Sequence, residues 1–127
     1  QTCALPISTP VVMSSWVRPG THVVGMGANA SNRRELDGDI IVRAGLIATD
    51  DVPQARTEAA EFIDLAKAGR LDWERVTPLH ELMAGPRPER APGAITVFKS
   101  LGVGLEDVAA ASVIYDRAIA SGRFKPL

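Results

Sequence analysis

The chain has 127 residues, of which 46% are hydrophobic and 23% charged, and its 14 basic and 15 acidic side chains leave a formal net charge of −1. This size and composition are those of one globular domain, and the balanced charge argues against a nucleic-acid partner and against a disordered acidic tail. No apolar run approaches the roughly 20 residues that cross a membrane, and the single cysteine, Cys3, excludes an internal disulfide and a cysteine-based zinc site. We therefore expect a cytoplasmic protein with no membrane, nucleic-acid or metal partner.

Residues 1–7, QTCALPI, look foreign to the domain, because they match the translation of a string that resembles the end of a widely used sequencing adapter. We exclude this segment, and Cys3 with it, from the expectations about the fold. An adapter in this position predicts that the reading frame begins inside a gene. The chain accordingly starts without an initiator methionine or a signal-peptide pattern.

Three short apolar runs predict buried strands, and they lie at 21–26, 46–49 and 95–98. The first two lack a clean alternation of polar and apolar residues, which is typical of parallel strands that are covered on both faces. We expect the first of these strands to lie parallel beside the second. A turn element at 16–20, with Pro19 and Gly20, precedes the first strand.

Helical signals follow each of these strands, so the chain is predicted to be an α/β unit with a parallel sheet and right-handed crossovers. Asp37 and Asp51 are suitable N-caps for the helices that follow them, and glycines supply the stops. The composition of "GPRPERAPG" predicts a mobile loop at 85–93. The predicted helices span 36–44, 51–69, 79–84 and 103–121.

Ligands of parallel α/β sheets sit beyond the carboxyl ends of the strands. That rule predicts that three segments meet at one edge of this sheet, namely the loop after Met26, the corner Asp50–Asp51 and the segment Lys99–Gly102. A strand end and a helix cap account for Asp50 and Asp51 without a catalytic role. We expect His22 to be a core residue on a buried strand and His80 to lie at the surface.

Residues 25–30, GMGANA, satisfy G-x-G-x-x-A, the phosphate-binding fingerprint of dinucleotide folds. The true fingerprint begins a helix at once, but the next residues, 31–35, are polar and have no apolar face. The sequence favours a polar loop at a strand end, in which the two glycines let the backbone approach a ligand and Asn29 and the arginine pair after it offer donors. A glycine turn with solvated charges explains the pattern equally well.

Two long segments resemble motifs of one family. "WVRPGTHVVGMGANASNRRELD", residues 16–37, resembles a signature of the ornithine cyclodeaminase and mu-crystallin family, and "ITVFKSLGVGLEDVAAASVIYDRA", residues 95–118, resembles its closing motif. The Thr9-Pro10 pair is similar to the segment before the first signature. The resemblance covers residues 8–122 in order and at matching spacing, so the chain is identified as a member of this family.

The resemblance implies a homodimeric enzyme with two domains, one for substrate and dimer formation and one of Rossmann type for NAD or NADP. By that comparison, residues 8–102 are the C-terminal part of the Rossmann-type domain, and residues 103–127 are a helix and tail that return towards a missing substrate domain. The phosphate fingerprint and the dimer-forming domain are expected upstream. The isolated chain is therefore expected to bind dinucleotide weakly and to be inactive.

The resemblance also implies which residues form the site. The loop after the first strand and a basic residue four or five positions further on contact the cofactor in relatives, as does the serine of the closing motif, and the residue after that serine faces substrate. The implied cofactor contacts are Met26, Gly27, Ala28, Asn29, Arg33 or Arg34, and Ser100, and the implied substrate contact is Leu101.

Asn29 departs from the pattern of ornithine cyclodeaminases, which carry an aspartate at this place as the proposed proton donor and acceptor. An amide has no titratable proton, so Asn29 in the catalytic position orients a group or a water and does not shuttle a proton. The leading hypothesis is thus an NAD(P)-dependent imine (ketimine) reductase or amino-acid dehydrogenase that acts on an amino-acid or imine substrate. The alternatives are an ornithine cyclodeaminase whose acid lies elsewhere and a non-catalytic, NADP-dependent small-molecule binder.

Overall fold

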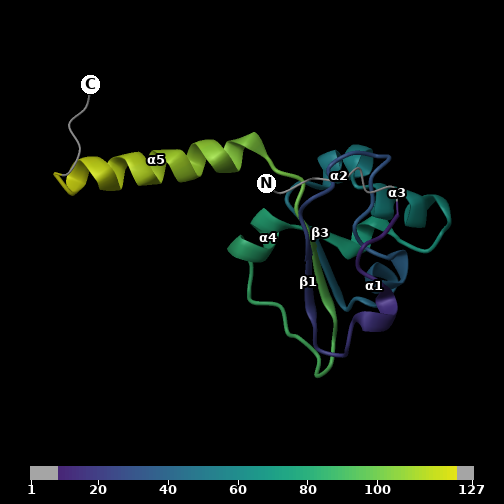
Figure 1. Cartoon of the computed structure of the whole chain (residues 1–127). Helices are drawn as coiled ribbons and strands as arrows, with labels where there is room; N and C mark the ends of the chain where they lie inside the picture. Colours follow the sequence, from purple (N-terminus) through teal and green to yellow (C-terminus); the bar gives the residue numbers. More distant parts are fainter. Residues whose placement is uncertain (1–8, 123–127) are drawn as a thin grey trace.

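Four parallel strands form the centre of the structure, a computed structural model that describes residues 9–122 (Figure 1). Helices connect the strands, and 3-10 turns precede β1 and β3. The elements in chain order are η1 (Ser14–Trp16), β1 (His22–Gly25), α1 (Gly38–Arg43), β2 (Leu46–Thr49), α2 (Val52–Glu58), α3 (Ala60–Lys67), η2 (Trp73–Arg75), β3 (Val76–Pro78), α4 (Leu79–Ala84), β4 (Thr96–Lys99) and α5 (Gly104–Ala120). The expectation that residues 1–7 are foreign, and with it Cys3, lies outside the described residues.

The sheet order is β1-β4-β2-β3, so β4 lies between β1 and β2. The expectation that the first strand lies beside the second was therefore wrong in adjacency, although the two strands are parallel to the same neighbour. β1 alternates exposed and buried residues from His22 to Gly25, as suits an edge strand, whereas three of the four residues of β4 are buried. β3 was not predicted, because it has three residues and ends in Pro78, which a sheet tolerates at its edge.

One face of the sheet packs against α1, α2 and α3, while α4 lies on the other side (Figure 1). Strand and helix residues of this layer form a single hydrophobic cluster, which includes Val23, Ile47, Val76 and Val97 from the strands and Ile40, Ile41, Ala55, Phe62 and Leu65 from the helices. The second face is less covered, since Val24 on β1 is exposed. His22 lies on the same face. It is exposed, so the expectation that it is a core residue was wrong.

The long helix predicted at 51–69 is two helices, α2 and α3, which break at Ala59 with a ψ of 88°. The residues from Ala59 to Phe62 are buried one after another. The break lies at the first residue of this buried stretch, and the other three residues are the first turn of α3. A local helix signal does not reveal it.

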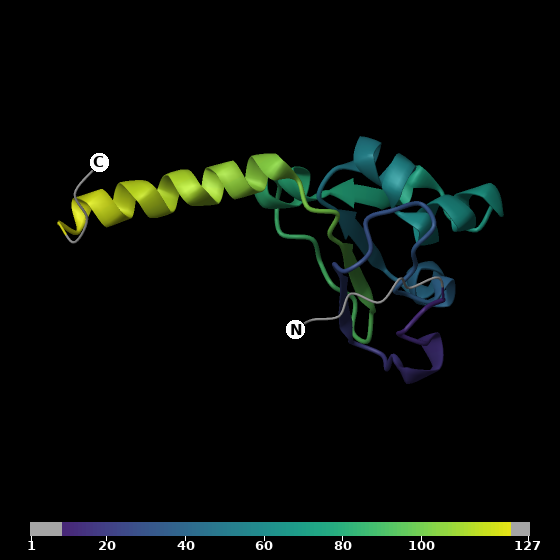
Figure 2. The same cartoon turned by 45° about the horizontal axis from the view of Figure 1, so that its top comes forward.

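Asp51 caps α2, as predicted, and its carboxylate accepts a hydrogen bond of 2.7 Å from the backbone N–H of Gln54. The last helix is also confirmed, and α5 extends away from the body of the molecule in both views (Figures 1 and 2). None of its residues is buried. Within residues 9–122, no helix combines the length and the apolar character that crossing a bilayer requires.

Candidate functional site

The carboxyl ends of β1, β2 and β4 lie at the same level of the sheet. Lys99 is paired with Gly25 on one side and with Thr49 on the other. The pairing continues one residue further, where the Ser100 N–H donates to the Gly25 carbonyl at 2.8 Å. The three segments that we expected to meet at this edge therefore do meet there.

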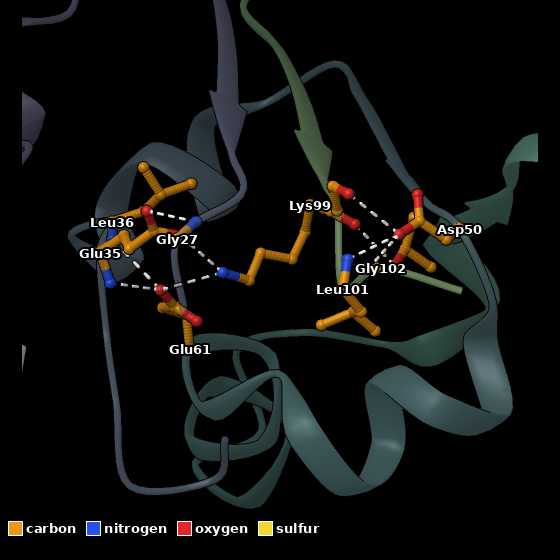
Figure 3. A network of polar contacts seen from close by, with 10 residues as sticks. Gly27, Glu35, Leu36, Asp50, Glu61, Lys99, Leu101 and Gly102 are labelled. Atoms are coloured by element: carbon orange, nitrogen blue, oxygen red, sulfur yellow. Dashed lines mark hydrogen bonds and ion pairs between the residues drawn. The ribbon is translucent and has the colours of Figure 1, made fainter. Parts of the chain in front are cut away.

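Asp50, directly after β2, holds the segment that follows β4 (Figure 3). One oxygen of its carboxylate accepts from the Ser100 hydroxyl at 3.1 Å and from the N–H groups of Leu101 and Gly102 at 2.6 and 3.0 Å. The Thr49 hydroxyl adds a bond of 2.8 Å to the Lys99 carbonyl. Asp50 is thus buried and engaged as a structural acceptor, which confirms the interpretation of this residue as a strand end.

Lys99 is the last residue of β4, and its side chain is fully buried, with 0% exposed. Its Nζ lies 2.8 Å from an Oε of Glu35 and 4.0 Å from an Oε of Glu61 on α3. Figure 3 shows the side chain extending from β4 towards these two carboxylates and away from Asp50. A buried ammonium of this kind requires paired carboxylates, because an unpaired charge in the interior is strongly unfavourable.

Glu35 and Glu61 close the base of the loop that follows β1. The second oxygen of Glu35 accepts from the Gly27 N–H at 2.7 Å, and Glu61 accepts from the N–H groups of Glu35 and Leu36 at 2.6 and 3.2 Å. A Cβ added at Gly27 would lie 2.6 Å from Glu35 Oε1. The absence of a side chain at Gly27 therefore makes room for the Glu35 carboxylate, and the cofactor contact of Gly27 stays a prediction.

The ion pair sets the protonation state of Glu35. Burial alone would raise the pKa of this carboxyl, but the hydrogen bond and charge of Lys99, together with the amides of Gly27 and Ala28, outweigh burial and lower the pKa below 4.5. Glu35 is therefore a carboxylate at neutral pH. It has no proton to give there, and both of its oxygens are engaged.

The loop between β1 and α1 carries most of the residues implied as cofactor contacts. α1 begins only at Gly38, so no helix follows the glycines, and the G-x-G-x-x-A match is not a dinucleotide fingerprint. Met26 is 74% exposed, Asn29 is exposed, and Ala28 is buried. The side chains of Met26 and Asn29 are accessible to a ligand at this edge, whereas Ala28 contributes at most its backbone.

The structure separates the two candidate arginines. Arg34 donates to the carboxylate of Asp64 on α3 and forms an ion pair with it. Arg33 is exposed, and its guanidinium has no hydrogen bond or ion pair with any residue between 9 and 122. This difference favours Arg33 over Arg34 as a donor to a bound group.

Ser100 and Leu101 follow β4 at the same edge. The Ser100 hydroxyl donates to Asp50, so its oxygen can still accept a hydrogen bond. Leu101 is 3% exposed and belongs to the hydrophobic cluster, and its N–H is bonded to Asp50. The substrate contact of Leu101 stays a prediction, since a buried side chain meets a ligand only if the ligand covers or displaces its neighbours.

The cluster of Lys99 with Glu35 and Glu61 was not predicted from the sequence; Lys99 and Glu61 are buried in it and Glu35 is partly buried. Signals for two of them were present. Lys99 ends a run of apolar strand residues, and Glu61 stands between alanines and Phe62 at interior positions of a helix. Charged side chains in apolar runs are rarely buried unless paired, so their positions mark candidates for a buried ion pair.

A cleft of about 460 Å³ opens at the same edge, between α4 and the start of α5. Glu106 lies at this cleft, where slight burial and then the negative charges of Asp50 and Asp107 raise its pKa above 4.5. His80 is exposed there, as expected. The part of the chain that the structure describes contains no group of three or more His, Cys, Asp or Glu placed to hold a metal ion.

Comparison with known proteins identifies the family. A model described as the ornithine cyclodeaminase/mu-crystallin family matches residues 2–122. The chain belongs to this family. Alanine dehydrogenase of Archaeoglobus fulgidus is 34% identical over 116 residues, which are 90% of this chain and 35% of that protein. Ketimine reductase mu-crystallin of Mus musculus is 34% identical over 107 residues, which are 84% of this chain and 32% of that protein.

Solved structures of relatives confirm the fold as part of a Rossmann-type α/β domain. An iminosuccinate reductase of Paracoccus denitrificans in complex with NAD+ superposes with a TM-score of 0.79 at 31% identity, over 93% of this chain and 36% of that chain. An archaeal alanine dehydrogenase dimer with bound NAD gives 0.77 at 34% identity, over 92% and 37%. The chain spans about a third of the length of the curated relatives that it matches.

Proposed function

We propose that this chain is the C-terminal part of an NAD(P)-dependent reductase or dehydrogenase. The enzyme would interconvert an imine, which is either a cyclic imine or a 2-imino acid, and the corresponding amino acid. The observation that carries the proposal is the exposed amide of Asn29 in the loop after β1. Glu35 and Asp50, the carboxylates held against this loop and against the segment after β4, are both committed to hydrogen bonds within the chain. A reaction that needs orientation around a hydride transfer fits this edge better than one that needs a proton-shuttling carboxylate.

The residues at the carboxyl edge fit the nicotinamide half of a dinucleotide. Met26 offers an exposed apolar side chain, and Asn29 and Ser100 offer a neutral donor and an acceptor of the kind that a carboxamide pairs with. The free guanidinium of Arg33 can offset phosphate charge. NAD and NADP are distinguished at the end of a different strand of the fold, so the proposal covers both.

In this proposal the chain orients the substrate and the cofactor and excludes water from the site. The cofactor, when bound, supplies or takes the hydride. Asn29 orients the substrate or the nicotinamide through its amide, and Ser100 fixes the cofactor from the neighbouring strand. Leu101 is proposed to face substrate. Two relatives are described with NAD or NAD+ bound, and one of them as a dimer, which supports a cofactor-binding homodimer. We further propose a small amino-acid or imine substrate and a cytoplasmic location.

A second candidate, ornithine cyclodeaminase, is favoured by the position of the Glu106 carboxyl at the cleft between α4 and the start of α5. The pKa of Glu106 is raised by slight burial and by the charges of Asp50 and Asp107, and a carboxyl with a raised pKa is suited to proton transfer. In that case the acid that Asn29 lacks would be supplied from the start of α5. Glu106→Gln would then abolish ammonia release from ornithine, whereas the reductase reaction would be retained.

The test is a steady-state assay of the complete protein with NADH and with NADPH, a cyclic imine, and a 2-oxo acid plus ammonia, with ornithine in parallel. We expect oxidation of one cofactor with the imine or the 2-oxo acid, and no ammonia from ornithine. Asn29→Asp is the matched variant, because it adds only the missing carboxylate. Cyclodeaminase turnover by the unaltered protein would contradict the proposal, and cofactor binding without any turnover would favour a non-catalytic binder.

A further inference from the structure

Lys99 joins the two segments that are proposed to hold the cofactor. Its backbone is paired with β1 and β2, and its carbonyl accepts from the Thr49 hydroxyl, so the residue is fixed on both sides. Ser100 is the next residue along the chain. The Lys99 side chain runs the other way and ends 2.8 Å from Glu35, at the base of the loop after β1 (Figure 3).

We propose that Lys99 is a positioning residue, whose buried ammonium acts through Glu35 to hold the loop of residues 26–35 at a fixed distance from Ser100. Because the cofactor pocket at this edge is itself proposed, this role rests on the proposed function. Lys99 touches no bound group. It sets where Met26 and Asn29 stand relative to the segment after β4.

The two oxygens of Glu35 carry this effect from Lys99 to the loop. One oxygen accepts from Lys99 and the other from the Gly27 N–H, eight residues earlier in the chain. The Glu35 side chain is therefore held at both ends, and Gly27 adjoins the exposed Met26. Without the ammonium, the partly buried Glu35 carboxylate would turn towards solvent, because an unpaired charge is unfavourable in the interior. The Gly27 N–H would then lose its acceptor.

Glu61 makes the cluster dependent on this one cation. It is buried, it accepts from the N–H groups of Glu35 and Leu36, and its second oxygen has no hydrogen-bond partner among residues 9–122. Two carboxylates therefore share one ammonium. The nearby guanidinium of Arg34 is paired with Asp64, so no other described cation replaces Lys99 in the cluster.

A buried ion pair that only stabilises the fold would behave differently from one that positions a loop. Loss of a stabilising pair raises exchange of backbone amides wherever global unfolding governs it. Loss of a positioning pair raises exchange first in the loop. Hydrogen exchange by mass spectrometry on the chain therefore separates the two roles without any cofactor.

The variants are Lys99→Met, Glu35→Gln and the double variant, with Arg70→Gln as the control because it removes the exposed ion pair of Arg70 with Asp39. We expect Lys99→Met to raise exchange at residues 26–35 at least tenfold while β2 and α2 stay protected. Glu35→Gln removes the charge that pairs with Lys99, but it keeps an oxygen for the Gly27 N–H and leaves Glu61 beside the ammonium. It should therefore fold where Lys99→Met does not, and raise exchange at residues 26–35 by less than Lys99→Met. In the double variant Glu61 stays buried without a cation, so we expect exchange at residues 26–35 to remain raised.

Kinetics on the complete protein give the second measurement. Lys99→Met should lower kcat/KM by on the order of 10²-fold, as displacement of a positioned group by about 1 Å can do, whereas Arg70→Gln should leave it unchanged. The pH profile should change as well. The charged groups that face Glu35 are Lys99 on β4 and Glu61 on α3, so removing the ammonium lets burial raise the pKa of Glu35. The acid limb of kcat/KM should then move to higher pH.

Two results would overturn the proposal. One is exchange that rises equally over the whole chain in Lys99→Met, and the other is a protected loop in Glu35→Gln with an unshifted acid limb in Lys99→Met. The failure of the proposed function looks different. In that case the unaltered complete protein neither binds nor oxidises NADH or NADPH, while the exchange measurement still reports whether Lys99 holds the loop.

Discussion

α3 and α5 are both amphipathic helices of this chain, but only α3 has a partner. The eight residues of α3 bury four side chains against the sheet, including Phe62, whereas the 17 residues of α5 bury none. Apolar side chains on α5 are exposed, as for Leu105 at 75%. An amphipathic pattern therefore tells us that a helix has a face to bury, and it does not tell us where the partner lies.

This difference between α3 and α5 predicts that substitutions in α3 lower the free energy of unfolding more than substitutions in α5. Phe62 is fully buried and packs edge-on against Trp73, with ring centroids 6.1 Å apart. Phe62→Ala should lower the free energy of unfolding by about 3–5 kcal/mol, measured by urea denaturation. The control on α5, Ile114→Ala, should change it by less than about 0.5 kcal/mol. Equal losses would mean that α5 is packed in solution.

The N-caps of α2 and α5 also differ. Asp51 accepts from the Gln54 N–H at the start of α2, while the N-cap of α5, Val103, makes no side-chain hydrogen bond. Asp51→Ala should cost about 1 kcal/mol of stability. Val103→Ala removes no cap and should be close to neutral by that mechanism. Thermal denaturation of the two variants measures the difference, and an unchanged Asp51→Ala would show that the cap contributes nothing.

Acid pH should lower the free energy of unfolding, because it protonates Glu35. Its folded pKa is lowered, because the hydrogen bond and charge of Lys99 and the amides of Gly27 and Ala28 outweigh burial, which would raise it. The stability that this carboxylate contributes is therefore fully present above its unfolded pKa near 4.5, and it is lost as pH falls through the lower folded pKa. Urea midpoints of the unaltered chain and of Glu35→Gln should converge as pH falls below 4.5. A constant gap between them would contradict the ion pair.

The smallest effect on the free energy of unfolding is expected for an ion pair at the surface. Arg70 and Asp39 form an ion pair in which both side chains are at least half exposed. Such pairs contribute little, because water and salt screen them. Arg70→Gln should change the free energy of unfolding by less than about 0.5 kcal/mol, and 0.5 M salt should remove even that. A loss comparable to that of Phe62→Ala would mean that surface charge, rather than apolar burial, holds the turn after α3 against α1.

Elements with local signals could be predicted from the sequence. Asp37 and Asp51 mark helix starts, Gly122 follows the last helix, and the strands are apolar runs. The sheet order could not be predicted, because which strand lies in the middle depends on pairing between distant segments. The break at Ala59 was hidden for a similar reason. Alanine and glutamate favour helix, so the local sequence at Ala59 gives no sign of the break.

The candidate site divides in the same way. Asn29 and Arg33 could be placed at the carboxyl edge because they follow a strand, whatever the sheet order. The pair of Lys99 with Glu35 joins residues 64 positions apart, and no local pattern predicts it. The choice between Arg33 and Arg34 likewise depends on Asp64, which lies on a helix that only the folded chain brings near.

A crystal structure of the complete protein with NADH or NADPH bound would show directly where the cofactor lies. We expect the nicotinamide half beyond the carboxyl ends of β1 and β4, in contact with Met26, Asn29 and Ser100. A dinucleotide that is bound elsewhere and leaves these three residues in solvent would contradict it.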